Sequence, residues 1–556
     1  MIIYQILFAA ISIIFLFLYY YTIGFFLYPI FFCNKKKHRT RLNENIFLGL
    51  IANILFLYFW NLFFPINGKG FLVFILICLL IGIKSGSFND IKNIAGRFRP
   101  KFFIFIITIS IWLGFLSSNP IGPYDLGLYH LQVIKWAESF HIIKGIGNLH
   151  HRLGFSCSSW LLSSQFNVFL DTKLFLWTHG AIYLLIGFIN FLYVPVFSKI
   201  QIKKSEKIIR VLYLPILVNL CFSSFPGTSS DLPVFLFTSI ISLYYFKFIC
   251  YKENNSLNMI FVILVLGVSN KLTFGAVIIG LIIPFTFIII KRMVTLNYLN
   301  RGIILLSFLT FILWSCRNVI MTGYPLYPYA GISFPVEWKM DRSKVEREKN
   351  QVIAYAREYA DLKVFDNKER LSWYLNKITR VQHRKIEIYY PLIIGIFGLF
   401  YSIVFIKKKL YQIFILVLPS LVPIFLWIQI PGSRFFSSSF WWFGIMLLAF
   451  PITRMMKNLN YFYLLIIILS ISVQTFDRLG SPKNFFPMYI RTKIPNIAIQ
   501  KITNAKGMTY FSPKDGDQCW DSPLPCSPEQ EFWLKNIIQN NKNELKRGFK
   551  LKKSDK

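Results

Sequence analysis

Residues 2–32 read IIYQILFAAISIIFLFLYYYTIGFFLYPIFF, and this stretch decides the fold class because it contains no charged side chain. A helix needs about 20 apolar residues to cross the roughly 30 Å hydrocarbon core of a membrane. No basic residue precedes the apolar run, which favours an uncleaved span over a cleaved signal peptide. Comparable runs recur as far as Phe476, so the sequence predicts a multi-pass membrane protein.

The composition of the 556-residue chain agrees with this prediction. It is 55% hydrophobic and 15% charged, with a mean hydropathy of +0.51. These values argue against an ordinary water-soluble enzyme and exclude a disordered, collagenous, coiled-coil or disulfide-rich secreted protein. A net charge of +36 would suggest a nucleic-acid partner in a soluble protein. Here much of it lies in short loops, so we expect membrane lipid as a partner and no nucleic acid.

About fourteen apolar runs are expected to span the membrane, which makes the fold class an all-α polytopic membrane protein. The expected spans are 5–30, 46–65, 70–86, 102–118, 174–197, 209–225, 232–249, 259–270, 274–290, 302–318, 390–406, 410–430, 439–452 and 460–475. One set of alternate short loops carries 25 Lys and Arg residues and the opposite set carries 7. The positive-inside rule places the first set in the cytoplasm and both termini outside.

This topology divides the chain into alternating membrane and outer regions. The regions are the membrane helices of 1–118, a first large outer loop at 119–173, membrane helices at 174–318, a second outer loop at 319–389, membrane helices at 390–476, and an extracytoplasmic tail at 477–556. In that tail Cys519 and Cys526 lie seven residues apart, which favours a small disulfide loop on an oxidising face. Metal binding by this pair is the weaker alternative because no second Cys or His pair lies nearby.

The first outer loop contains the leading catalytic candidate. Turns at 119–123 precede Asp125, which is therefore also well placed to be a simple helix cap. On a 3.6-residue wheel Asp125 shares a face with Tyr129, Gln132 and Trp136. The other face carries Leu126, Val133, Ala137 and Phe140, and we expect it to lie in the membrane interface. After a Gly145/Gly147 break comes His150-His151-Arg152, a group of candidate binding residues.

Ionisable residues at the outer ends of spans are further candidates, because they are expensive at membrane depth. They are Asp231, Lys271, Arg317 and Arg434. Arginine and lysine there suit a phosphate, whereas Asp231 can also be a helix cap and Lys271 a snorkelling side chain. Lys271 interrupts a 32-residue apolar stretch, which we interpret as two helices that turn at the lysine. For Arg317 a structural pairing with Asp125 or Asp231 is the favoured alternative.

Several enzyme classes lack sequence support. There is no P-loop, GxGxxG, HExxH or Gly-x-Ser-x-Gly motif, which argues against nucleotide hydrolysis, zinc proteolysis and serine hydrolysis. Many spans, Asp125 followed by Tyr129 in a large first outer loop, and a later Lys-containing break resemble the GT-C superfamily of polyprenyl-phosphate-sugar glycosyltransferases. From Asn119 onward, motifs such as Ser-Ser-Asp231-Leu-Pro, Ser433-Arg-Phe-Phe and Gly516-Asp-Gln-Cys-Trp also resemble poorly characterised bacterial membrane proteins of surface-polysaccharide gene clusters.

The GT-C resemblance implies an inverting transfer at the outer face of the bacterial cytoplasmic (inner) membrane. The donor would be a polyprenyl-phosphate-linked sugar and the acceptor a glycan or lipid-linked molecule. Asp125 would act as general base, with Asp231 as a second catalytic candidate. Lys271, Arg317 or Arg434 would neutralise the departing phosphate, and Tyr129, Trp136 or Trp520 would stack on sugars. Many relatives hold Mg²⁺ or Mn²⁺ with a second acid, but here that position is Leu126, so no metal is assigned.

Three alternatives remain open from the sequence. A lipid-linked oligosaccharide polymerase or ligase would share the membrane, the outer site and the arginines, with residues 317–384 as its large late loop. A transporter or flippase would need no covalent chemistry, although no internal repeat or mid-membrane polar residue is clear. In a structural assembly factor Asp125 would be only a helix cap.

Overall fold

The structure is a computed structural model, and it describes most of the chain. The described residues are 2–31, 42–84, 100–117, 124–167, 174–198, 201–223, 228–253, 255–290, 299–356, 385–405, 410–430, 432–456, 458–479, 494–528, 534–539 and 545–551. They are mostly helical. The predicted all-α multi-pass class is therefore confirmed at this level, with small β-hairpins added in the tail.

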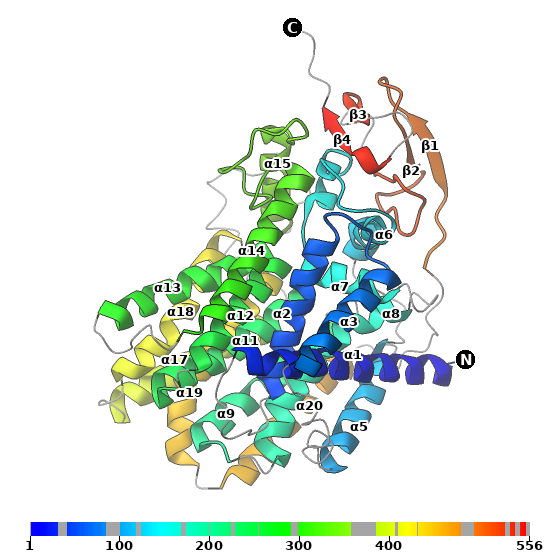
Figure 1. Ribbon diagram of the computed structural model, residues 1–556. Helices are drawn as coiled ribbons and strands as arrows, with labels where there is room; N and C mark the ends of the chain where they lie inside the picture. Colours follow the sequence, from blue (N-terminus) through cyan, green and yellow to red (C-terminus); the bar gives the residue numbers. More distant parts are fainter. Residues whose placement is uncertain are drawn as a thin grey trace.

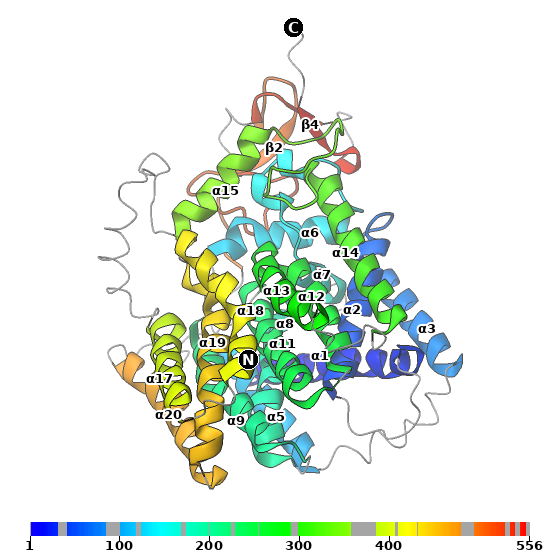
Figure 2. The ribbon, with the colours of Figure 1, turned by 90° about the vertical axis from the view of Figure 1, so that its left-hand side faces the viewer.

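Nine helices in the described ranges are long and apolar enough to cross a membrane. They are α1 (Ile2–Phe31), α2 (Leu42–Trp60), α5 (Pro100–Ser117), α8 with its π-helical end η5 (Leu174–Phe188, Ile189–Phe197), α11 (Asp231–Tyr251), α14 (Arg301–Thr322), α17 with η10 before it (Tyr390–Phe405, Lys385–Tyr389), α18 (Leu410–Gln429) and α19 (Ser433–Met455). In both views α1 runs across the bundle at a large angle to α2 (Figures 1 and 2).

Helices outside this set of nine account for the other expected spans. They are α3 (Gly68–Lys84), α9 (Lys204–Leu212), α10 (Leu214–Ser223), α12 (Asn255–Asn270), α13 (Gly275–Ile290) and α20 (Leu459–Leu479). Each of the fourteen expected spans overlaps a helix, but the number that crosses a membrane stays a prediction. The helix break predicted at Lys271 is confirmed, because α12 ends at Asn270 and the short turn η6 (Leu272–Phe274) leads into α13.

Polar segments from three parts of the chain gather at one end of the bundle, opposite α9 (Figures 1 and 2). We call this end the cap. It contains η2 (Leu126–His130), α6 (Leu131–Ser139), the turns η3 (Ile146–Asn148) and η4 (His151–Gly154), α15 (Arg342–Ala356), η13 (Leu545–Arg547), and the strands β1 (Ile499–Thr503), β2 (Thr509–Pro513), β3 (Ile537–Gln539) and β4 (Phe549–Leu551). Strand β1 pairs antiparallel with β2, and β3 pairs antiparallel with β4.

The cap has a hydrophobic core of its own. Leu126 and Val133 from the first loop are buried in one cluster with Tyr510, Leu534 and Phe549 from the tail. The apolar side of this helix was expected to lie in the membrane interface, and that expectation is wrong. The tail strands supply an apolar surface that removes the helix side from water, and this burial favours the packed arrangement.

The first large loop does not stay in the cap. Its second half forms α7 (Ser158–Asn167), which packs against α2, α3, α8 and α12 inside the bundle. Ser163 and Ser164 are fully buried, and each hydroxyl donates at 2.9 Å to a backbone carbonyl one turn earlier. Gln165 is likewise buried and accepts a 2.7 Å hydrogen bond from Asn53. Internal hydrogen bonding therefore lets a polar ten-residue helix enter the bundle.

Candidate functional site

Asp125 lies where the chain enters the helical part of the cap. It occupies the N-cap position of the following helical segment, as expected, but it has a helical backbone and makes no side-chain cap hydrogen bond, so its carboxylate does not cap the helix. The next five residues form the π-helix η2, in which the Leu131 N–H bonds to the Leu126 carbonyl. A helical wheel with 3.6 residues per turn therefore does not give the correct side-chain directions across this stretch. Asp125 and Tyr129 still converge, because both contact Arg152.

Arg152 joins two carboxylates that lie far apart in the sequence. Its Nη1 lies 3.1 Å from Asp125 Oδ1, and its Nε lies 3.8 Å from Glu348 Oε1. His151 Nε2 lies 2.7 Å from Glu348 Oε2. Burial alone would lower the pKa of Arg152, but Glu348 and its other negative neighbours raise it, so the guanidinium stays charged. We call Asp125, His151, Arg152 and Glu348 the outer charge cluster.

The members of this cluster differ in access to solvent. The Glu348 side chain is 0% exposed, whereas Asp125 and Arg152 are 21% and 22% exposed. A buried carboxylate is tolerated when opposite charges surround it, and it then fixes the orientation of those charges. Glu348 therefore anchors Arg152, which in turn holds Asp125 at an accessible position.

Sequence reasoning did not identify Glu348 as a site residue. Val345, Glu348, Val352 and Ala356 follow a helical spacing of three and four residues, so the acid occupies a place in an apolar stripe. An acid within an apolar stripe was the sequence feature that could have identified Glu348. In the structure Val345 packs against Tyr324 and Tyr327, and this docking carries Glu348 to Arg152.

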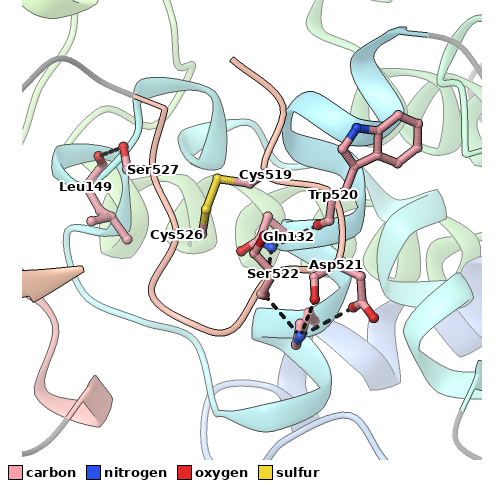
Figure 3. Close-up of a disulfide and its surroundings, with 9 residues drawn as sticks. Gln132, Leu149, Cys519, Trp520, Asp521, Ser522, Cys526 and Ser527 are labelled. Carbon is pink, nitrogen blue, oxygen red and sulfur yellow. Dashed lines mark hydrogen bonds and ion pairs between the residues drawn. A yellow bond between two sulfur atoms is a disulfide. The ribbon is translucent and has the colours of Figure 1, made fainter. Parts of the chain in front are cut away.

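The tail encloses Asp125 from the other side. Cys519 and Cys526 form a disulfide, and Figure 3 shows its loop beside Gln132. Gln132 donates to the carbonyls of Trp520 at 2.9 Å and Ser522 at 3.1 Å. Lys135 bonds to the Asp521 carbonyl at 2.9 Å and to its carboxylate at 3.3 Å. These bonds fasten the disulfide loop to α6.

Residues on both sides of Asp125 are held by the same tail segment. The Trp520 N–H donates to the Gly127 carbonyl at 2.8 Å, and a Cβ at Gly127 would lie only 2.5 Å from the Trp520 ring. On the other side the Tyr124 hydroxyl bonds to the Asp517 carboxylate. Partial burial and this acid raise the pKa of Tyr124 to about 12, so the phenol stays protonated and donates. The tail thus fixes the backbone around Asp125.

A second ion pair lies where α11 begins and α12 ends. Asp231, the first residue of α11, pairs with Lys271, and their side chains are 16% and 18% exposed. Asp231 is therefore part of an ion pair and is more than a helix cap. Lys271 binds a protein carboxylate, so it is more than a snorkelling side chain. The Thr228 segment just before Asp231 contacts the Asp125 helix, because Thr228 Oγ1 lies 2.8 Å from His130 Nδ1.

The remaining predicted residues lie elsewhere. Trp136 is only 3% exposed and packs against Phe140 and Phe549, so its role is packing and not sugar stacking. His150 is 3% exposed, with its ring centroid 5.0 Å from that of His151. Arg317 donates to Asn61 at 2.5 Å, which corrects the expected pairing with Asp125 or Asp231. Arg434 is the second residue of α19, and its side chain lies outside the described residues.

A pocket adjoins the outer charge cluster between the first loop, α15 and the tail. It is lined by Gly147, Asn148, His151, Lys344, Arg347, Glu348, Gln351 and Leu534. Within the described part of the chain, no group of three or more His, Cys, Asp or Glu side chains could hold a metal ion. The Arg152 guanidinium also lies within ion-pair distance of both Asp125 and Glu348, where a bridging cation would have to bind. This set of residues does not fit Mg²⁺ or Mn²⁺.

These features define the class as a multi-pass α-helical membrane protein with a polar cap at one end. A family model described as a domain of unknown function, DUF8201, matches residues 6–441, so the chain belongs to this family. No curated protein and no solved structure matches the chain. The match includes Asp125, Arg152, Asp231, Lys271 and Glu348 but ends before the disulfide loop.

Proposed function

We propose that this protein is a GT-C-type membrane glycosyltransferase. It would move a sugar from a polyprenyl-phosphate-linked donor to a glycan or lipid-linked acceptor. The observation that carries the proposal is the outer charge cluster, in which a buried acid and an arginine hold the accessible carboxylate of Asp125. Such an arrangement, with a perturbed charge network beside a pocket, is typical of a functional site.

In the proposed reaction Asp125 accepts the proton of the acceptor hydroxyl. The acceptor oxygen forms a bond to the anomeric carbon while the bond from that carbon to the phosphate oxygen breaks. The polyprenyl phosphate leaves with the bonding electron pair, and a single displacement inverts the anomeric centre. A positioned base typically contributes roughly 10²- to 10⁴-fold to such a step.

Lys271 is the proposed partner of the departing phosphate. Asp231 holds the Lys271 ammonium at the end of α12. We therefore assign Asp231, which the sequence offered as a second catalytic candidate, the role of positioning Lys271. An ammonium at this depth stabilises the negative charge that develops on the leaving phosphate. Energy for the transfer comes from the activated donor, so no nucleotide-binding motif is required.

We place the cap on the outer face of the bacterial cytoplasmic membrane. The support is the loop charge asymmetry together with the Cys519–Cys526 disulfide in the cap, since disulfides persist in oxidising compartments. The donor, the acceptor and both chain termini would then lie on that side.

A lipid-linked oligosaccharide polymerase or ligase is the second candidate. One observation favours it: α15, from the second large loop, contributes Glu348 to the cluster and two cations to the pocket. Such enzymes would use a late outer loop of this kind to hold a glycan chain.

The test compares lipid-linked intermediates and surface glycans, by mass spectrometry, in cells with native protein or Asp125→Asn at equal membrane abundance. Asp521→Asn is the matched control, because Asp521 is a cap carboxylate that is 33% exposed and paired with Lys135. We expect Asp125→Asn to remove one sugar and accumulate a polyprenyl-phosphate monosaccharide. Accumulation of whole unpolymerised units would favour the polymerase or ligase, and an unchanged profile would refute the catalytic assignment of Asp125.

A further inference from the structure

The Asp231–Lys271 ion pair is tied to the first large loop on the side of its carboxylate. Thr228, three residues before Asp231, is only 3% exposed and is held by two residues of that loop. Its Oγ1 lies within hydrogen-bond distance of His130 Nδ1, at 2.8 Å. Its carbonyl accepts a 2.9 Å hydrogen bond from the indole N–H of Trp160. Both the side chain and the backbone of Thr228 are therefore fixed by the first loop.

The short connection from Thr228 to Asp231 leaves the carboxylate little freedom. Ser229 Oγ accepts the Asp231 N–H at 3.2 Å and donates to the Asp231 carboxylate at 3.4 Å. Asp231 is also the first residue of α11, so its backbone continues directly into a regular helix. A shift of Thr228 therefore displaces the carboxylate that holds Lys271.

The ammonium side of the ion pair is tied to the same loop. Lys271 directly follows Asn270, the last residue of α12, which is 3% exposed. The Ser159 hydroxyl donates to Asn270 Oδ1, and the Cys157 thiol lies 3.5 Å from the same oxygen. Ser159 and Cys157 both belong to the first loop. One segment of chain thus sets the place of both partners in the ion pair.

His130 lies between this ion pair and the outer charge cluster. It follows Tyr129, whose ring centroid is 5.6 Å from the Arg152 guanidinium carbon, and Arg152 bonds to Asp125 at 3.1 Å. The His130 side chain belongs to a residue that is 3% exposed, and its ring centroid lies 4.5 Å from that of Tyr129 and 4.8 Å from that of Trp160. Close packing against two aromatic rings restricts the direction in which Nδ1 points.

We propose that His130 is a positioning residue. Through its hydrogen bond to Thr228 it sets where the ion pair lies relative to Asp125. The catalytic meaning of this link rests on the proposed transferase function, in which one substrate meets the base and the ammonium together. Reacting groups must be held in the correct geometry, and a small misplacement that starts far from the chemistry lowers the rate. A hydrogen bond between two buried groups suits this task, because leaving either group unpaired costs free energy.

The first test does not depend on activity. It measures acetylation of Lys271 by a small amine-reactive reagent, in the full chain in lipid nanodiscs, by peptide mass spectrometry. Lys135 is the reference in the same molecules, since it is 30% exposed and paired with a tail carboxylate. His130→Phe keeps an aromatic ring but removes Nδ1, and Thr228→Val removes the hydroxyl. Each should raise labelling of Lys271 relative to Lys135 about fivefold, the factor that one hydrogen bond contributes to holding the pair. Thr228→Ser keeps a hydroxyl and should retain the native ratio.

The second test measures the initial transfer rate per folded molecule in membrane vesicles. His130→Phe and Thr228→Val are each expected to lower it about five- to tenfold, and the double variant no further, because both remove the same hydrogen bond. Ser242→Ala is the matched control. Ser242 lies on α11, is 0% exposed and shares a 2.6 Å hydrogen bond with Tyr213, so its loss costs stability without touching Thr228. Labelling and transfer should both stay native in this control.

Three results would overturn the inference. They are an unchanged labelling ratio in both His130→Phe and Thr228→Val, additive rate losses in the double variant, and equal changes in Ser242→Ala, which would indicate general destabilisation. Asp125→Asn separates the inference from the proposed function. Lost glycan product in Asp125→Asn with unchanged labelling in His130→Phe refutes the positioning role alone. A raised labelling ratio with an unchanged glycan profile in Asp125→Asn refutes the catalytic meaning but supports the link from His130 to the ion pair.

Discussion

Two buried arginine–carboxylate clusters lie at opposite ends of the bundle and are built differently. At the end away from the cap, Arg210 and Glu206 are one turn apart on α9 and only 9% and 5% exposed. Arg210 Nε and Nη2 donate to Glu206 Oε1 at 3.0 and 2.7 Å, and Nη1 donates to Asn190 Oδ1 at 3.0 Å. Asn190 and Asn43 then bond to each other. We call this set the inner charge cluster.

The outer charge cluster is instead long-range and open. Arg152 reaches Asp125, 27 positions earlier, and Glu348 on a helix from another loop. One-fifth of Asp125 is exposed, and a pocket adjoins the cluster. A local network with satisfied partners stabilises a fold, whereas a network that leaves polar atoms accessible is available for binding and chemistry. The same residue types therefore have a structural role at one end and, in the function we propose, a catalytic role at the other.

The largest effect on stability is expected from Glu206→Gln. Removing one charge from a buried pair leaves Arg210 uncompensated, which costs about 3–5 kcal/mol of the free energy of unfolding. An unfolding titration in mixed micelles measures this loss. Glycan product per folded molecule should stay unchanged, and a fall in that ratio would show that the inner cluster is functional.

Glu348→Gln sharpens the comparison because it makes the same change in the outer cluster. Without its negative charge the anchor for Arg152 weakens, and misplacement of a supporting group can cost roughly a hundredfold in rate. The initial transfer rate in membrane vesicles measures this effect. Glu346→Gln is the control, since Glu346 lies on the same helix and is 49% exposed. Equal rates in the two variants would contradict the role of Glu348.

The double variant Cys519→Ser, Cys526→Ser tests how firmly the tail holds α6. Loss of a disulfide that closes so short a loop is expected to cost about 2–3 kcal/mol. Hydrogen exchange should therefore speed up at residues 516–527, including the Trp520 N–H that donates to the Gly127 carbonyl. Unchanged protection there would mean that the hydrogen bonds of Gln132 and Lys135 suffice.

The smallest effect is expected from Asp521→Asn. The Lys135–Asp521 pair is about one-third exposed, and such pairs contribute roughly 0–1 kcal/mol. Lys135 also keeps its bonds to the carbonyls of Asp521 and Ser522. Thermal stability and transfer rate should both remain near the native values, and a large loss of either would place Asp521 in the site.

The sequence predicted the features that depend on local composition. Apolar runs gave helices near their expected bounds, and the break at Lys271 was visible because one apolar stretch was too long for a single span. Asp125, Tyr129 and Arg152 were all among the candidates, and the structure brings them together. All three come from residues 125–152, so a short segment of chain already limits how far apart they can lie.

What the sequence could not predict depends on distant partners. Arg317 bonds to Asn61, 256 positions away, and nothing in the local pattern indicates this choice. Glu348 reaches Arg152 only after α15 docks on the cap. The tail strands are only three to five residues long, and the apolar surface that the tail packs against comes from the first loop. Trp136 was misjudged because the surface that buries it comes from the tail.

The most direct test of the central claim is the initial transfer rate of Asp125→Asn in membrane vesicles, measured per folded molecule from the native pool of polyprenyl-phosphate sugars. We predict a loss of roughly 10²- to 10⁴-fold with native-like unfolding, because the amide cannot accept the proton. A rate equal to that of the native protein would contradict the assignment of Asp125 as general base and leave the outer charge cluster a structural feature like its inner counterpart.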